Sequence, residues 1–179
     1  DLIVSRGLGD VYKRQVLPQD VIWNSDESGY YTIKNNSIVL VSTVGKKDKD
    51  ILTSSDVSGM EIESFFFSQD KKKVLIFTNS VRVWRYNTRG DYFVYDLKSK
   101  DGHRLGSSLP EKSLMFAKFS PNSRSVAYVS KEIIPNSFRN SSTRANIYIE
   151  NIIDKKVTKL TESDDNGKII NGTFDWVYE

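Results

Sequence analysis

The sequence predicts an all-β fold, namely part of a β-propeller with about three four-stranded antiparallel blades. From residue 16 onward, short apolar runs alternate with polar turns, a pattern typical of strands rather than helices. A strand–turn–strand unit also recurs at a spacing of 52 residues, since Phe67 is matched by Phe119 and Val74 by Val126. Repeats of roughly 40 to 55 residues with four strands each are typical of propeller blades. A β-sandwich, which also uses short strands and regular turns, is the structural alternative.

Composition sets outer limits on what the 179-residue chain can be. Apolar residues make up 38% and aromatic residues 12%, enough for a buried core. The 26 basic and 23 acidic residues give a net charge of +3, without the concentrated basic surface that nucleic-acid binding requires. There is no cysteine, which excludes disulfides and cysteine-based zinc sites. No apolar run approaches the roughly 18 residues of a membrane-spanning helix.

The first fifteen residues differ from the rest of the chain. They show neither helical nor alternating apolar periodicity, and nothing later resembles them. We therefore expect residues 1–15 to be a non-native leader and residues 16–179 to be the N-terminal part of a propeller domain, truncated after about three blades. The alternative, an anion-binding loop around Gly7 and Gly9, rests on a single Gly-x-Gly without the strand and helix that such loops need.

The predicted elements follow one plan. Each repeat begins with a hairpin whose Ser-x-Asp or Ser-x-Asn turn bonds back to the backbone, and two more strands follow. The two clear hairpins turn near residues 68–72 and 120–123. The remaining expected strands are 92–97, 103–105, 146–152 and 157–160, with an earlier, more diverged unit at 21–23, 30–33, 38–43 and 51–53. The side chains expected to be buried are Phe67, Val74, Ile76, Phe119, Val126 and Tyr128.

The sequence offers no catalytic residue of its own. It contains no Gly-x-Ser-x-Gly segment, which hydrolases of the α/β class use for their nucleophile. His103 is the only histidine, and its turn-flanked position favours a solvated surface side chain. We expect no cofactor and no metal, although a calcium site made only of carboxylates stays open.

Three segments depart from a simple blade pattern. Residues 81–87 place a Trp, a Tyr and two Arg where a short loop suffices, so this loop is a binding candidate; packing of Trp84 in the blade core is the alternative. Residues 172–179 hold three aromatic and two acidic residues, and could also be an ordinary packed strand. Residues 131–144 are a polar insertion longer than a hairpin requires.

Two of these segments carry a resemblance to a known family. Asp175–Glu179 reads Asp-Trp-Val-Tyr-Glu, and Trp84-Arg85 precedes the Tyr-Asp-Leu of residues 95–97. In these motifs and in their order, the chain resembles the N-terminal propeller of the dipeptidyl peptidase IV family of prolyl-specific serine peptidases. In the family, the Asp-Trp-Val-Tyr-Glu motif continues with two more glutamates, whose positions would follow Glu179.

The resemblance implies an eight-bladed propeller that caps an α/β-hydrolase domain, absent here, which holds the serine, aspartate and histidine of the catalytic triad. The propeller would recognise and gate peptide substrates with a free N-terminus, from which the parent enzyme removes X-Pro or X-Ala dipeptides. Arg85 would bind a substrate carbonyl oxygen, and Glu179 opens the motif that binds the substrate amine. The fragment alone would be inactive. The resemblance further implies a periplasmic, secreted or cell-surface parent without nucleic-acid partners, and leaves a homodimer open.

Two other functions remain open on the sequence. One is a non-enzymatic propeller that binds protein or peptide partners, because the fold alone does not fix the function. The other is a related peptidase that lacks amine recognition or releases tripeptides. Two further glutamates after Glu179 and a downstream Gly-x-Ser-x-Gly segment would distinguish the dipeptidyl peptidase from both.

Overall fold

The computed structural model describes residues 21–26, 28–82, 88–133, 143–162, 169 and 171–173. Within these ranges every regular element is a strand, which confirms the predicted all-β class. Among the described residues there is no helix long and apolar enough to cross a membrane. The predicted leader, residues 1–15, lies outside the described ranges.

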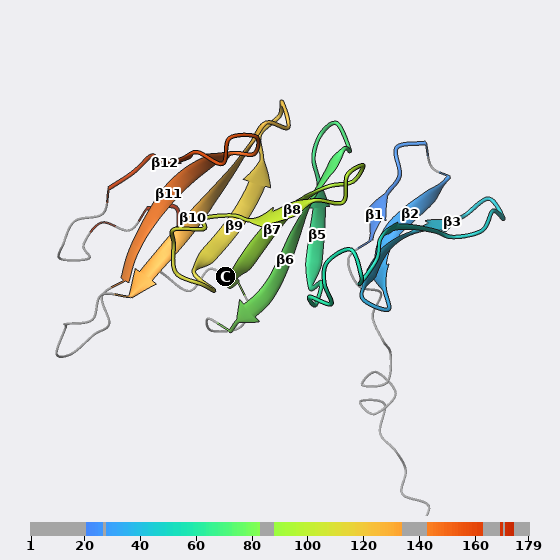
Figure 1. The fold of residues 1–179 in the computed structure, drawn as a ribbon, viewed down its shortest axis with the longest axis horizontal. Helices are drawn as coiled ribbons and strands as arrows, with labels where there is room; N and C mark the ends of the chain where they lie inside the picture. The colour runs from blue at the N-terminus through green and yellow to red at the C-terminus, as the bar shows by residue number, and fades with distance from the viewer. Residues whose placement is uncertain are drawn as a thin grey trace, which may run out of the picture.

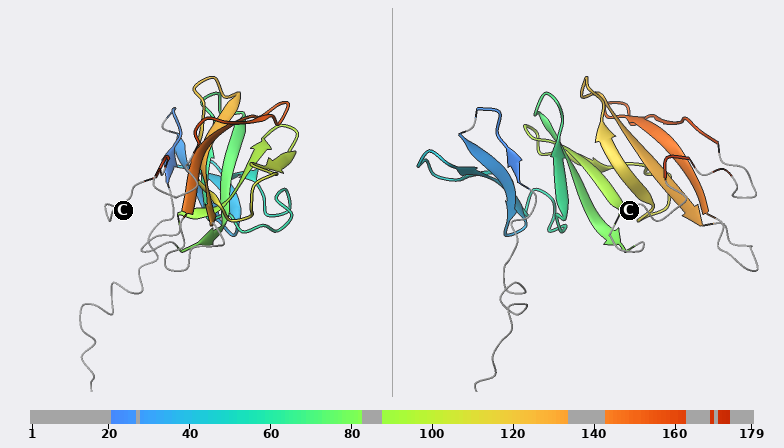
Figure 2. Two further views of the ribbon diagram at one scale, coloured as in Figure 1. Left: turned by 90° about the vertical axis from the view of Figure 1, so that its left-hand side faces the viewer. Right: turned by 180° about the vertical axis from the view of Figure 1, so that it is seen from behind.

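The twelve strands of the described ranges form three antiparallel units of four. Figures 1 and 2 show the units standing side by side, with β1–β4, β5–β8 and β9–β12 following one another across the molecule. The strands are β1 Ile22–Trp23, β2 Gly29–Lys34, β3 Ser37–Ser42, β4 Lys49–Leu52, β5 Ser64–Phe67, β6 Lys73–Val81, β7 Arg89–Asp96, β8 Gly102–Arg104, β9 Leu114–Phe119, β10 Ser125–Ile133, β11 Thr143–Asn151 and β12 Val157–Lys159. This is the meander of propeller blades that the 52-residue repeat predicted.

The second and third units touch through their backbones at one point. Gly90 of β7 pairs with Leu114 of β9, which joins the two units into one eight-stranded sheet. A side chain at Gly90 would place its Cβ 2.6 Å from both the Phe77 ring and the Thr78 carbonyl oxygen. Glycine is therefore required by the close packing of β7 against β6 within the second unit, at the residue that also pairs with the third unit.

The long hairpins extend further than the sequence predicted. β7 begins at Arg89 and β11 at Thr143, each three residues before its predicted start. The insertion predicted at 131–144 is therefore strand at both ends, and Ile133 pairs with Thr143. Polar residues can extend a hairpin where its end reaches solvent, so polarity alone did not mark the strand ends. Residues 134–142 lie outside the described ranges.

The core lies between neighbouring units, and β6 contributes to both sides of it. Val74 and Ile76 pack toward the first unit, whereas Leu75 and Phe77 pack toward the third. Successive strand residues point to opposite faces, so a strand buried on both faces must be apolar throughout. This explains the continuous run Val74-Leu75-Ile76-Phe77, of which no residue is more than 8% exposed.

The two hairpin turns repeat the same hydrogen bonds 52 residues apart. In the first, the Ser68 hydroxyl donates to Asp70 Oδ1 (2.6 Å) and accepts from the Lys73 amide (3.0 Å). In the second, Ser120 donates to Asn122 Oδ1 (2.7 Å) and accepts from Ser125 (3.0 Å). Among the side chains that make these hydrogen bonds, the two turns differ only in Asp70 against Asn122, and both predicted hairpins are confirmed.

This difference gives a pH prediction for Asp70→Asn. The hydrogen bonds from Ser68 and the Lys72 amide lower the pKa of Asp70. A carboxylate with a lowered folded pKa stabilises the fold above its unfolded pKa of about 3.9, and this stabilisation is lost as the pH falls through the folded value. We expect Asp70→Asn, which copies the second turn, to preserve stability at pH 7 and to reduce its loss between about pH 4 and pH 2. Urea unfolding at a series of pH values measures both, and an unchanged acid dependence would contradict the prediction.

Candidate functional site

The loop that carries Arg85 leaves the sheet from a bulged hairpin end. β6 and β7 pair regularly up to Thr78, and the register then shifts before Val81 pairs with Arg89. Asn79 within the bulge adopts a left-handed φ of 52°, and the Ser80 amide donates to Glu63 Oε1 at 2.8 Å. Bulges of this kind redirect side chains at the rims of sheets. Arg85 itself, with residues 83–87, lies outside the described ranges.

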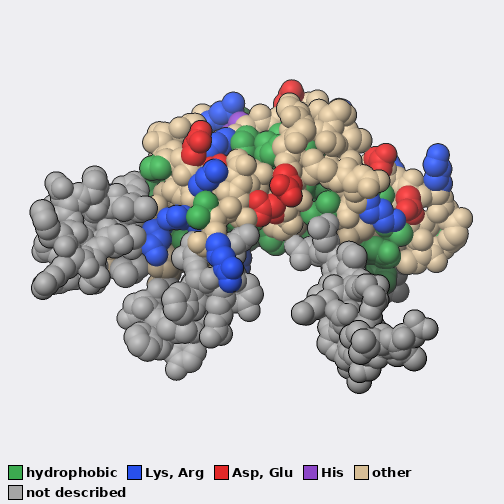
Figure 3. All heavy atoms as spheres, turned by 90° about the horizontal axis from the view of Figure 1, so that it is seen from below, with side chains coloured by type: hydrophobic (Ala, Val, Ile, Leu, Met, Phe, Trp, Pro, Cys, Tyr) green, Lys and Arg blue, Asp and Glu red, His purple; other side chains and the backbone are tan. Residues whose placement is uncertain are grey.

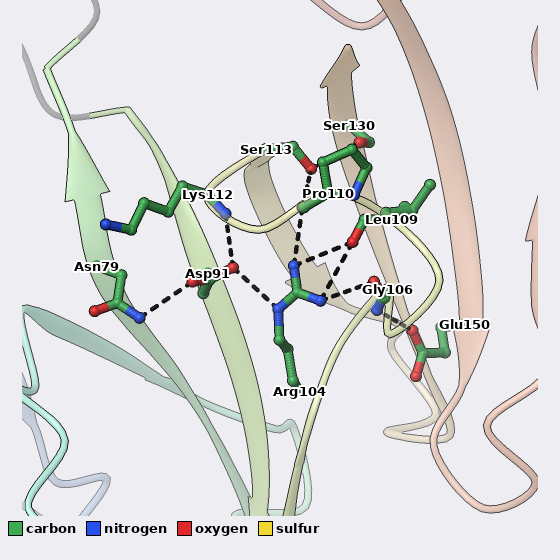
Figure 4. Close-up of polar contacts among 10 residues, drawn as sticks. All are labelled: Asn79, Asp91, Arg104, Gly106, Leu109, Pro110, Lys112, Ser113, Ser130 and Glu150. Carbon is green, nitrogen blue, oxygen red and sulfur yellow. Dashed lines mark hydrogen bonds and ion pairs between the residues drawn. The ribbon is translucent and has the colours of Figure 1, made fainter.

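A buried carboxylate holds the base of this hairpin (Figure 4). Asp91, only 2% exposed, accepts hydrogen bonds at Oδ1 from Arg104 Nε (3.0 Å) and the Lys112 amide (2.9 Å), and at Oδ2 from Asn79 Nδ2 (3.1 Å). Both oxygens are thus satisfied, as a buried charge requires. The carboxylate connects β7 to the bulge of β6, to β8 and to the segment that leads into the third unit.

Arg104 extends the network from its other side. Its two terminal nitrogens donate to the carbonyl oxygens of Gly106 (3.2 Å), Leu109 (3.4 Å) and Pro110 (2.9 Å). The planar guanidinium suits such a multi-donor arrangement. The pair Asp91–Arg104 therefore fixes the connection between two blades to the hairpin that carries Arg85. Neither residue was predicted from the sequence; the one sequence signal for them is an Asp within the apolar run of β7.

The C-terminal motif is also preceded by an anchored segment. The Asn171 amide donates to the Ala145 carbonyl at 3.1 Å, and Gly172 has a φ of +75°. A Cβ on Gly172 would lie 2.6 Å from Val129 Cγ2 and 2.9 Å from Ile147 Cγ1, so glycine is required by both its conformation and its packing. Residues 174–179, including Glu179, lie outside the described ranges.

The Asp91 network and the Ala145–Asn171 hydrogen bond lie at the same end of the sheets. β6 and β10 finish at the lower edge in Figure 1, and Ala145, which holds Asn171, pairs with Lys131 near the end of β10. Figure 3 looks at this end from below, and the described part that it shows has acidic and basic side chains interspersed rather than one dominant sign.

The sequence context of the single histidine predicted a solvated surface side chain, and the structure contradicts this prediction. The His103 side chain is only 17% exposed, and its Nε2 lies 3.3 Å from Oε1 of Glu150, without hydrogen-bond geometry. The other oxygen of Glu150 accepts from the Gly106 amide (2.8 Å) and the Tyr128 hydroxyl (3.1 Å). Burial, followed by the charge of Glu150, raises the pKa of Tyr128. The prediction was wrong because β8 packs against β11 of the next unit, which no local pattern indicates.

An apolar cleft separates the inner strands of the second and third units. It has a volume of about 510 Å³ and is lined by residues of β5, β7, β9 and the two turns: Phe66, Phe67, Gln69, Tyr92, Phe116, Ala117, Lys118, Phe119, Ser120 and Pro121. Phe67 and Phe119, expected to be buried, are only half-buried because they line this cleft; the other four residues expected in the core are fully buried. Burial raises the pKa of Tyr92 to about 12.

Within the described ranges, no three His, Asp or Glu side chains lie close enough together to hold a metal ion. The described polar clusters are built from hydrogen bonds and ion pairs between protein groups, as around Asp91 and Glu150.

Comparison with known proteins places the chain in a family. The family described as "Dipeptidyl peptidase IV (DPP IV) N-terminal region" matches residues 68–179, more than half of the chain. The chain belongs to this dipeptidyl peptidase IV N-terminal region family. The match includes the loop of Arg85 and the motif that ends at Glu179, the two segments that carried the resemblance.

Individual relatives agree with the family assignment. Dipeptidyl aminopeptidase B of Saccharomyces cerevisiae is 32% identical over 94% of this chain, and human prolyl endopeptidase FAP is 26% identical over 88%. In each case the chain spans only 19% of the relative. The crystal structure of Porphyromonas gingivalis dipeptidyl peptidase 4 matches the fold with a TM-score of 0.67 at 20% identity, over 89% of this chain and 22% of that one. The partial propeller is thus a fold shared with a dipeptidyl peptidase IV N-terminal region.

Proposed function

We propose that the chain is part of a substrate-recognition and gating propeller in a serine exopeptidase that removes X-Pro or X-Ala dipeptides from peptides with a free N-terminus. The observation that carries this proposal is the family match over the segments of Arg85 and Glu179. Arg85 would bind a substrate carbonyl oxygen. Glu179 would open the acidic motif that receives the substrate amine.

The fold supplies a physical basis for such recognition. An exopeptidase must detect a terminal ammonium group at a fixed distance from the scissile bond, and carboxylates in a partly desolvated site do so through charge-assisted hydrogen bonds. The segments that precede the two predicted binding groups are held at the same end of the blades, one by Asp91 and the other by Ala145. Anchored segments supply the fixed geometry on which such selectivity depends.

The remaining parts of the proposal follow from the family. Catalysis would reside in a C-terminal α/β-hydrolase domain outside this chain, so the 179-residue chain would have no peptidase activity by itself. The parent protein would work in the periplasm, outside the cell or at its surface.

The test compares substrates with free and blocked amino termini. We expect the full-length parent to cleave Ala-Pro-p-nitroanilide and to lose at least about tenfold in kcat/KM on its N-acetyl form, since each hydrogen bond to the charged amine is worth about 1.5–3 kcal/mol. The 179-residue chain should release no p-nitroaniline above background. Equal cleavage of both substrates would contradict amine recognition. Binding of peptides without any cleavage by the parent would instead favour the non-enzymatic propeller.

A further inference from the structure

The end of the β6–β7 hairpin contains an unusual concentration of unpaired polar atoms. Among the described residues, four buried side-chain nitrogen or oxygen atoms have no hydrogen-bond partner. Three of them are Thr78 Oγ1, Thr88 Oγ1 and Arg89 Nε; the fourth, in His103, lies beside Glu150. Buried polar groups are normally paired, because each one left unpaired costs about 1–3 kcal/mol. The unpaired groups therefore lower the stability of the fold at this hairpin end, and packing does not explain why they are there.

Arg89 is the charged member of this group. It is the first residue of β7, it pairs through its backbone with Val81 across the bulge, and its side chain is half-buried. Within the described part of the chain its guanidinium forms no hydrogen bond and no ion pair. A guanidinium in this position has lost part of its hydration and gained no partner in return.

The carboxylate closest in sequence is not free to pair with it. Asp91, two residues further along β7, is saturated by Asn79, Arg104 and the Lys112 amide (Figure 4). Arg104 and Arg89 thus contrast sharply. Arg104 is fully engaged in holding the structure, whereas the buried Nε of Arg89 has no hydrogen-bond partner at the end of the blade from which the Arg85 loop leaves.

We propose that Arg89 binds a carboxylate of the peptide substrate. A guanidinium matches a carboxylate through two parallel hydrogen bonds, and this pairing is stronger and more selective than one to a neutral oxygen. The carboxylate is either an acidic side chain at the substrate N-terminus or the C-terminus of a short peptide. The inference rests on the proposed function, to which it adds a preference for anionic substrates.

The experiment uses Arg89→Gln in the full-length parent with matched substrates that differ by one charge. Asp-Pro-p-nitroanilide against Asn-Pro-p-nitroanilide tests an acidic side chain, and Ala-Pro-Ala against Ala-Pro-Ala-amide tests a C-terminal carboxylate. We expect the variant to raise KM about tenfold or more for the anionic member of one pair, with kcat retained and the neutral member changed by less than about twofold. Arg124→Gln, an exposed arginine in the β9–β10 turn at the other end of the blades, is the control and should behave as the wild type.

The outcomes separate this inference from the proposed function. Equal effects of Arg89→Gln on charged and neutral substrates, or no effect on either pair, overturn the carboxylate site while leaving the peptidase assignment intact. If Arg89→Gln lowers the Tm of the parent but leaves the kinetics unchanged, Arg89 pairs with another part of the protein, and the proposed carboxylate site is overturned. If the parent cleaves none of these substrates, the proposed function fails, and calorimetric titration of Asp-Pro-amide into wild type and Arg89→Gln still decides whether the carboxylate is bound.

Discussion

Replacing Asp91 with alanine is expected to lower the free energy of unfolding of the chain by about 3 kcal/mol, the lower end of the range for breaking a buried ion pair. The substitution removes the acceptor for Arg104, Asn79 and the Lys112 amide at once. Arg104 would then hold a charge in a site where its side chain is 19% exposed. This residual exposure is why the lower end of the range applies.

Urea or thermal unfolding of the chain measures this change. Asp101→Ala, an exposed aspartate in the β7–β8 connection, is the matched control and should change stability by less than about 0.5 kcal/mol. A double-mutant cycle of Asp91→Ala with Arg104→Met isolates the pair itself, with a coupling energy of about 0.5–3 kcal/mol expected for groups in one network. Additive single effects would show that the two side chains contribute independently and would refute the network.

Replacing Arg85 with alanine in the full-length parent is expected to reduce kcat/KM about 10- to 150-fold on Ala-Pro-p-nitroanilide. The range corresponds to about 1.5–3 kcal/mol for a hydrogen bond that involves a charged group. Arg85→Lys should recover only part of the loss, because an ammonium group cannot present the planar donor fork. Steady-state kinetics of the purified variants measure both effects.

The control for this prediction is Arg124→Ala, which removes an arginine from an exposed turn. It should leave kcat/KM unchanged, and all variants should show the Tm of the wild type. An Arg85→Ala enzyme with normal stability and normal kcat/KM would assign the residue to the solvated surface and remove the main predicted contact from the substrate site.

The turns show how much local sequence can predict. Ser68 with Asp70, and Ser120 with Asn122, form their hairpins through hydrogen bonds that span five residues or fewer, so the sequence contained everything needed. The strand ends were less predictable, since β10 and β11 continue through polar residues that pair with each other. The prediction stopped at the polar residues because their pairing partner lies across the hairpin.

In the candidate site, too, some residues could be predicted from local sequence and others only from the tertiary structure. Arg85 and Glu179 were found from contiguous motifs, and their predicted roles await the kinetic tests. Asp91 and Arg104 lie thirteen residues apart on different strands, and their pairing depends on how β7 and β8 meet. Arg89 was overlooked because the feature that distinguishes it is the absence of a partner among the described residues, and no sequence pattern records that.

By itself, the sequence determined the all-β class, the 52-residue repeat, the turn chemistry and the family motifs. All of these depend on residue periodicity or on groups close together in the chain. Only the tertiary structure decided that β6 is buried on both faces, that His103 is half-buried beside Glu150, and that Phe67 and Phe119 line a cleft. These features arise where one blade meets the next, between residues that are distant in sequence, and burial there depends on the packing of the neighbouring blade.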